Sequence, residues 1–253
     1  MKRTVLLLLA LLVALAGCKS GGRGAEDPLL QLSAEESLVM GKELLTQQKY
    51  ARARPYFQHA FEVEPNSAIG REGLLLAADT YYQEGGTANY VQAEAKYRDF
   101  LNRFPTSEQA PYVQFQIANS LAKRMEKPDR DQTVTRKALD AYRELARIYP
   151  TSEYAAQAQE QISLVHNNLA EHEFTVGRFY LRYGIYMGAV QRFETLLNDF
   201  PQYPNRDKVI YHLGLAYDKM GKLEDADKTF DRLKTEFPES PFLAEIPQRR
   251  AQT

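Results

Sequence analysis

The side chains best suited to metal binding or nucleophilic catalysis are few in this chain of 253 residues. They are one cysteine and four histidines: Cys18, His59, His166, His172 and His212. A zinc site needs several such ligands held together, and zinc proteases carry two histidines four residues apart with a glutamate between them. No two of these histidines have that spacing. The sequence therefore predicts no metal site.

Two short polar segments resemble ligand sites at first sight. Residues 83–88 read QEGGTA, but they do not lead from a strand into a helix as a phosphate-binding loop does, so we expect a turn. Residues 129–132 read DRDQ, where we expect Asp131 or Thr133 to cap the following helix. No other group of residues has the types needed for acid–base or covalent catalysis. We therefore expect no catalytic residue, no cofactor and no enzymatic activity.

The N-terminal segment has the layout of a secretory signal. Lys2 and Arg3 precede an uncharged apolar run over residues 5–16, which is shorter than the roughly 20 residues that span a bilayer. Residues 15–18 read LAGC, which resembles the lipobox of bacterial lipoproteins, whose cysteine receives lipid after cleavage. We predict a signal peptide over 1–17 and lipidation of Cys18. An ordinary signal peptide with a chance cysteine is the alternative.

The residues after Cys18 suggest a tether and a location. Residues 18–33 are small, polar and Gly-rich at their start, which favours a flexible segment. Lys19 follows the cysteine in place of the Asp that retains enteric lipoproteins in the inner membrane, which favours the outer membrane. The net charge of −1 gives no argument for binding nucleic acid.

Five prolines divide the rest of the chain, and each follows the same pattern. They are Pro65, Pro105, Pro150, Pro201 and Pro238. The residue twelve positions earlier is always alanine: Ala53, Ala93, Ala138, Ala189 and Ala226. The residue eight positions earlier is always aromatic: Phe57, Tyr97, Tyr142, Phe193 and Phe230. Alanine and aromatic are four residues apart and share one helical face, and the proline then ends the helix.

The helix before each of these helices also repeats. Gly177 and Tyr180 precede Pro201 by 24 and 21 residues, and Gly214 precedes Pro238 by 24 residues. This pattern resembles the tetratricopeptide repeat (TPR), a helix-turn-helix unit of about 34 residues. We predict an all-α fold, an α-solenoid of five TPR units within residues 34–247, with a C-terminal tail over 248–253. The units are expected at about 34–67, 71–106, 111–151, 170–203 and 207–240.

The fourth unit starts later than the repeat length requires. Residues 152–184 contain no proline, and their apolar residues keep a helical spacing. We expect one long helix here, which offsets unit four from unit three. A short closing helix is expected over 240–246.

Stacked helix pairs form a curved surface, and folds of this kind mostly hold proteins or peptides. In TPR proteins the first helix of each unit lines the concave side. The residues that this places in the groove of the first three units are Leu38, Lys42, Leu75, Asp79, Tyr82, Phe115 and Asn119. Their mixture of apolar, aromatic, amide and charged groups suits a peptide with large side chains. For any single member, packing between repeats or a solvated surface is the alternative.

The whole pattern resembles a narrower family, the BamD (YfiO-like) outer-membrane assembly lipoproteins. The resemblance covers nearly all of the chain after the signal. Its more specific parts are the DRD loop in unit three and the phrase over 169–201, LAEHEFTVGRFYLRYGIYMGAVQRFETLLNDFP. Here Leu169 to Glu173 match Leu-Ala-x-x-Glu, Phe179 and Tyr180 match Phe-Tyr, and the Ala-x-x-Arg-aromatic element is matched less strictly.

This resemblance implies a non-enzymatic subunit of the β-barrel assembly (BAM) complex, lipid-anchored at the periplasmic face of the outer membrane. It implies contact with the POTRA region of BamA and with other BAM lipoproteins, and recognition of unfolded outer-membrane proteins. For the BamA contact we predict Arg182 and Arg192 on unit four, because arginine often anchors interfaces.

Two other functions remain open at this point. The first is a different periplasmic TPR adaptor, such as a CpoB-like coordinator of envelope constriction. Those proteins carry an N-terminal coiled coil, which this sequence lacks, and the lipobox also argues against them. The second is an enzyme with a repeat module, for which the repeats leave no room.

Overall fold

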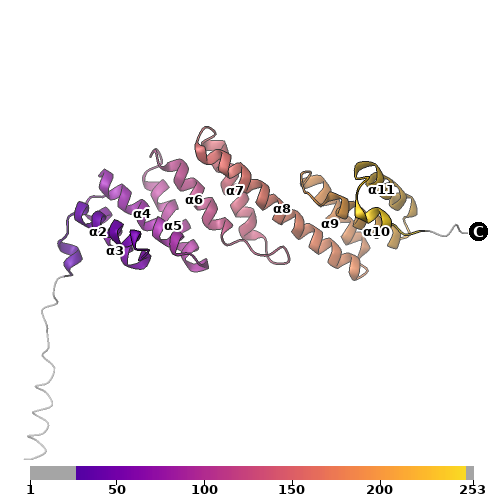
Figure 1. Cartoon of the computed structure of the whole chain (residues 1–253), viewed down its shortest axis with the longest axis horizontal. Coiled ribbons are helices and arrows are strands. Elements are labelled where there is room, and N and C mark those ends of the chain that lie inside the picture. The colour runs from indigo at the N-terminus through magenta and orange to yellow at the C-terminus, as the bar shows by residue number, and fades with distance from the viewer. Residues whose placement is uncertain (1–26, 249–253) are drawn as a thin grey trace, which may run out of the picture.

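The computed structural model describes residues 27–248 as an elongated row of helices (Figure 1). The signal peptide, Cys18 and residues 249–253 of the tail lie outside the described part. Its elements in chain order are η1 (Pro28–Gln31), α2 (Ala34–Thr46), α3 (Tyr50–Val63), α4 (Ala68–Glu84), α5 (Thr87–Arg103), α6 (Ala110–Ala122), α7 (Thr133–Ile148), α8 (Glu153–Arg182), α9 (Tyr186–Asp199), α10 (Arg206–Lys219), α11 (Leu223–Glu236) and η2 (Pro241–Glu245).

The ten α-helices pair into five consecutive hairpins, α2–α3 to α10–α11, each packed on the next. Residues 27–248 contain no strand. The predicted all-α solenoid of five TPR-type units is therefore confirmed. The predicted long helix is α8, which runs from Glu153 to Arg182.

The repeated small and aromatic residues meet inside each hairpin. A Cβ atom added to Gly177 would lie 2.5 Å from Cε1 of Phe193, a contact closer than real side chains make. Gly41 stands in the same relation to Phe57. Because the aromatic ring occupies the space of the missing side chain, the two helices of a hairpin approach each other closely. The spacing seen in the sequence is thus a packing requirement.

The residues after each proline cap the next helix in some units only. The hydroxyl of Ser67 accepts a hydrogen bond from the N–H of Gly70 at 2.9 Å and caps α4. Ser152 holds the same position before α8, but its side chain makes no capping bond and its Oγ is buried without a partner. The N-cap of α7 is Gln132, without a side-chain capping bond, and Asp131 instead accepts from the N–H of Thr133 at 3.2 Å.

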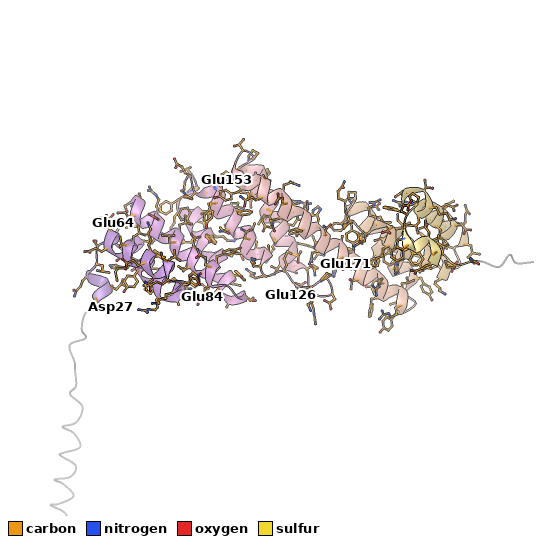
Figure 2. The ribbon with its side chains drawn as sticks, viewed as in Figure 1. Asp27, Glu64, Glu84, Glu126, Glu153 and Glu171 are labelled. Carbon is orange, nitrogen blue, oxygen red and sulfur yellow. The ribbon has the colours of Figure 1, made fainter. Side chains whose placement is uncertain are left out.

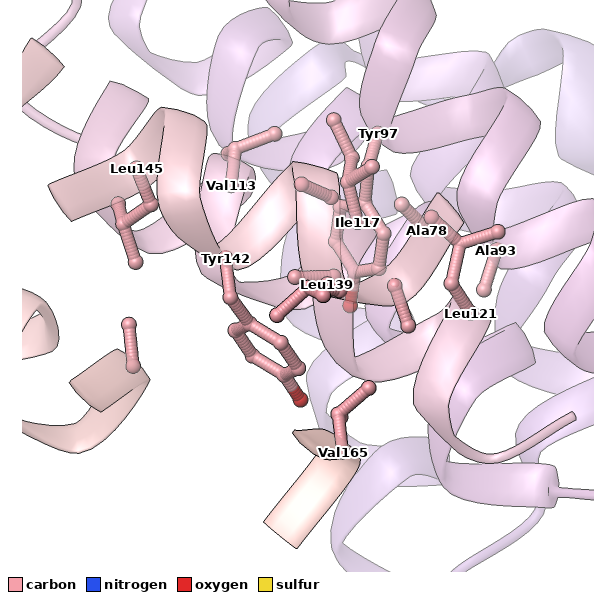
Figure 3. Close-up of a cluster of buried hydrophobic side chains, with 14 of the residues drawn as sticks. Ala78, Ala93, Tyr97, Val113, Ile117, Leu121, Leu139, Tyr142, Leu145 and Val165 are labelled. Atoms are coloured by element: carbon pink, nitrogen blue, oxygen red, sulfur yellow. The ribbon is translucent and has the colours of Figure 1, made fainter. Parts of the chain in front are cut away.

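The buried side chains form three clusters along the row. The first lies in unit one and includes Ala77 of α4. The second spans units two and three with the first half of α8, and the third spans the second half of α8 with units four and five. Figure 3 shows Tyr97, Ile117, Tyr142 and Val165, from α5, α6, α7 and α8, converging in the second cluster. Since α8 contributes to both the second and the third cluster, it connects units two and three with units four and five.

Both ends of the array differ in detail from the prediction. We expected a flexible tether up to residue 33, but residues 28–31 form η1, which packs on α3. His59 of α3 is within 3.1 Å of the carbonyl oxygen of Leu32 and holds this segment. At the other end the closing helix is the 3-10 helix η2, and Phe242 stacks on Tyr211 of α10 with ring centroids 5.2 Å apart.

Candidate functional site

A groove with a volume of about 970 Å³ opens between units two and three. Its walls are α4, the loop from α5 to α6 and the first turns of α6 and α8. Glu64, which precedes α4, and Glu153, the first residue of α8, lie along the same edge of the molecule in Figure 2. The residues on which the following description rests are Arg71, Leu75, Asp79, Phe104, Tyr112 and Tyr154.

The polar centre of the groove is Asp79 of α4, which is 8% exposed. Its Oδ1 accepts hydrogen bonds from the hydroxyl of Tyr97 at 2.6 Å and from the hydroxyl of Tyr112 at 2.9 Å. Burial raises the pKa of Asp79, and the two hydroxyl donors oppose that rise because they stabilise the charged form. Burial also raises the pKa of both tyrosines, and so does the Asp79 charge beside them. Both phenols therefore remain protonated donors.

A chain of hydrogen bonds runs from this carboxylate along α6. Gln116 donates to the hydroxyl of Tyr112 at 3.0 Å, and Asn119 donates to Gln116 at 2.9 Å. The hydroxyl of Tyr142 in α7 donates to Oδ1 of Asn119 at 2.7 Å. Every donor in the series points towards Asp79. Since each group is held by its neighbours, the polar side of α6 has a fixed arrangement.

Aromatic rings form a second part of the groove, next to Asp79. The rings of Tyr112 and Tyr154 meet edge to face with centroids 5.7 Å apart, and Phe115 lies 5.5 Å from Tyr154. Phe104 comes from the loop, with the guanidinium of Arg71 5.8 Å from its ring centre. The groove therefore joins an aromatic wall to a buried carboxylate, which is the combination of apolar surface and a few polar groups typical of ligand sites.

The predicted groove residues fall into three groups. Leu75 and Asp79 line the groove, and Lys42 stands at its rim, where it pairs with Glu72 at 2.6 Å. Two more border it: Phe115 packs on a wall residue, and Asn119 belongs to the hydrogen-bond chain.

Two predicted groove residues are placed differently. Tyr82 lies outside the groove lining, where its ring packs on Tyr90 at 5.7 Å. Leu38 is 6% exposed and belongs to the buried cluster of unit one, so the structure does not bring it together with the residues of this groove. The side chain of Leu38 instead packs between helices in that cluster.

Sequence reasoning missed Phe104, Tyr112 and Tyr154. Our positions were counted only along the first helix of each expected unit. Phe104 lies in the loop after α5, and Tyr154 lies in the first turn of α8, before the expected start of unit four. Tyr112 is three residues before Phe115 and so shares its helical face, which is the signal that could have identified it. The F-P-T-S sequence from Phe104 indicated only where one helix ends and the next is capped.

The two arginines predicted for the partner contact have different surroundings. Nη1 of Arg192 donates to Oε2 of Glu173 at 2.9 Å, which links α9 to α8 within unit four. Glu173 is 8% exposed, so Arg192 neutralises a buried carboxylate, although its own side chain is 40% exposed. Arg182 ends α8 and is exposed. Of the two arginines, Arg182 is therefore the one whose side chain is presented to solvent at the end of a helix, whereas Arg192 has a role inside the fold.

Large apolar side chains surround Arg182 on the surface. Phe179, Tyr183, Ile185 and Met187 are between 50% and 64% exposed and gather at the turn from α8 to α9. The rings of Phe179 and Tyr183 are in contact, with centroids 4.5 Å apart. We call these four residues with Arg182 the α8–α9 tip. Exposed apolar groups in one place commonly mark a protein interaction surface.

The described part of the chain also limits other kinds of site. Within residues 27–248, no helix is both long enough and apolar enough to cross a bilayer. The same part of the chain contains no group of three or more His, Cys, Asp or Glu side chains arranged to hold a metal ion.

Comparison with known proteins identifies the family. A family model described as "YfiO: Outer membrane lipoprotein" matches residues 31–233, which is most of the helical array. The chain belongs to the YfiO family of outer membrane lipoproteins. The resemblance inferred from the repeats, the unit-three loop and the unit-four phrase is thereby confirmed.

Curated relatives of this family match over nearly their whole length. The outer membrane protein assembly factor BamD of Neisseria meningitidis serogroup A is 28% identical over 251 residues, covering 95% of this chain and 94% of that protein. BamD of Rickettsia prowazekii is 28% identical over 249 residues, covering 96% of each. Among solved structures, the TPR2AB domain of yeast Sti1 in complex with pHSP90 overlaps with a TM-score of 0.43 at 14% identity, covering 81% of this chain and 78% of that one.

Proposed function

We propose that this chain is a non-enzymatic scaffold of the outer-membrane β-barrel assembly complex, with a role in the folding and insertion of outer-membrane proteins. The observation that carries the proposal is the match of the YfiO family model over residues 31–233, together with relatives named assembly factor BamD. Lipid on Cys18 anchors the chain at the periplasmic face of the outer membrane. Other BAM lipoproteins share the complex.

In this proposal the groove between units two and three receives unfolded outer-membrane proteins. Barrel strands alternate apolar and polar side chains and are rich in aromatics. The aromatic wall of Phe104, Tyr112 and Tyr154 can pack on such apolar side chains, and Asp79 supplies a polar contact in between. The hydrogen-bond chain along α6 fixes these groups before a ligand arrives, which lowers the entropy lost on binding.

The contact with the POTRA region of BamA is assigned to the α8–α9 tip. Phe179 and Tyr183 supply apolar area that is solvated in the free chain, and Arg182 supplies a cation at its edge. Aromatic residues and arginine are enriched at the centres of protein interfaces. Arg192 takes part through Glu173, because their ion pair holds α8 and α9 together behind the tip.

Affinity purification of the tagged full chain from envelope extracts tests the proposal. We expect BamA to be recovered with the wild type and to be lost with the double variant Phe179→Ser and Tyr183→Ser. Val91→Ser is the matched control, because Val91 is an exposed apolar residue on α5, far from the tip in sequence. Recovery of Tol or peptidoglycan-synthase components in place of BamA would contradict the proposed function.

A second experiment tests the groove. Crosslinking of unfolded porin segments to the chain should fall with Tyr154→Ala, while recovery of BamA stays at the wild-type level. Unchanged crosslinking would remove the groove from the proposal and leave the partner contact standing. Labelled palmitate tests the anchor, since it should enter the wild type and not Cys18→Ala.

A further inference from the structure

Asp79 is a buried acid that has hydrogen bonds but no counter-ion. Both of its donors, Tyr97 and Tyr112, are neutral phenols. Among the ion pairs of residues 27–248, none involves Asp79, although Arg54, Arg124 and Arg192 each neutralise a partly buried glutamate elsewhere in the array. Because buried charges in proteins are usually paired, an unpaired acid at the base of a groove is the exception that requires a reason.

One carboxylate oxygen of Asp79, Oδ2, receives no hydrogen bond from the two tyrosines. Both phenol hydroxyls donate to Oδ1 of Asp79, and Oδ2 receives neither bond. The donors of Gln116 and Asn119 are used within the chain along α6 and do not reach Oδ2. Since Asp79 contributes to the groove lining, its second oxygen is the acceptor that the network leaves for a ligand.

We propose that Asp79 is the specificity-determining polar anchor of the groove, and that its Oδ2 accepts a hydrogen bond from an N–H donor of a bound, extended polypeptide segment. This inference rests on the proposed function of the groove and adds the chemistry that the ligand must carry. The donor is either a lysine or arginine side chain or a main-chain amide of that segment.

The surroundings of Asp79 favour a polypeptide with large aromatic side chains on either side of the donor. Tyr112 both donates to Asp79 and packs against Tyr154, so the acid and the aromatic wall share a residue. A groove of about 970 Å³ accommodates several side chains of a ligand at once. Desolvation of the donor beside the acid makes the hydrogen bond stronger than the same bond in water.

Fluorescence anisotropy with the purified full chain tests this anchor. The probe is a fluorescein-labelled peptide that alternates phenylalanine and threonine and carries one central lysine. We expect Asp79→Asn to weaken binding at least tenfold, because the amide keeps an oxygen for the two tyrosines but presents NH₂ where Oδ2 was. Asp140→Asn, which changes an exposed acid on α7, is the matched control and should bind as the wild type does.

Two altered peptides distinguish the source of the N–H group. One replaces the lysine by norleucine, and the other carries N-methyl groups on the central main-chain amides. The peptide that lacks the true donor should bind wild type and Asp79→Asn equally, whereas the other should keep the tenfold difference. Circular dichroism of Asp79→Asn should match the wild type at the temperature of the assay.

Equal binding of the lysine peptide by wild type and Asp79→Asn would overturn the anchor. A third peptide that carries both changes has neither donor. A tenfold difference in its binding between wild type and Asp79→Asn would also overturn the anchor, because the variant would then have changed the groove itself. Tyr154→Ala separates these results from the proposed function. If it weakens binding while Asp79→Asn does not, the groove stands and only the anchor fails; if neither weakens binding, the groove fails with it.

Discussion

Gly177→Ala is predicted to destabilise unit four although alanine is the better helix former. In α8 the change gains about 1 kcal/mol of helix propensity. The new Cβ, however, would stand 2.5 Å from Cε1 and 2.9 Å from Cδ1 of Phe193, a ring with no exposed surface. Overpacking of a buried site costs about 1–3 kcal/mol. The net expectation is a loss of about 1 kcal/mol in the free energy of unfolding.

Urea unfolding of the purified chain, followed by circular dichroism at the helix band, measures this loss as a lower midpoint. Phe193→Leu supplies the internal control, because it removes the ring atoms that the added methyl group would meet. In the Phe193→Leu background Gly177→Ala should become neutral or stabilising. A stabilising effect of Gly177→Ala in the wild-type background would refute the packing explanation of the repeat.

Three further predictions concern caps, charge and pH. Ser67→Ala should lower the free energy of unfolding by about 1 kcal/mol because it removes the cap of α4. Ser152→Ala should be neutral or stabilising because that hydroxyl is buried without a partner. Equal shifts of the urea midpoint in the two variants would contradict this difference. Arg192→Ala leaves the buried Glu173 without its cation and should cost about 1–3 kcal/mol, while Arg192→Lys should recover part of the loss in the same assay. Burial lowers the pKa of His212 in the folded chain, so the unfolded chain takes up its proton first and stability falls as the pH drops below about 6.5. His212→Gln should reduce the difference between midpoints at pH 7.5 and pH 5.5, and an unchanged difference would exclude this histidine as its cause.

The repeated part of the fold was predictable because each repeat position either packs two helices together or ends a helix. A glycine or alanine facing an aromatic, followed by a proline eight residues after the aromatic, specifies two helices in close contact and where the second ends. Gly177 with Phe193 and Gly41 with Phe57 show that this signal reports a steric limit. The length of α8 was predictable for the opposite reason, since nothing between 152 and 176 interrupts a helix.

The candidate site was less predictable because it depends on the connections between repeats. Counting along first helices selected Leu75 and Asp79, which line the groove between units two and three. It also selected Leu38 at the same repeat position of unit one, to which the groove between units two and three does not extend. The four apolar residues of the α8–α9 tip were also missed, since exposed and buried apolar residues look alike in a sequence and only the folded turn separates them.

A single helix, α8, connects the groove with the α8–α9 tip, to which the BamA contact is assigned in our proposal. Tyr154 borders the groove near the start of α8, and Tyr183 follows its last residue. At about 1.5 Å per residue these positions are about 43 Å apart along a single rod. A tilt of about 5° at the groove would displace the far end by about 4 Å. If the groove and the tip act as proposed, α8 is a rigid lever that carries a displacement from the occupied cradle to a distant docking point.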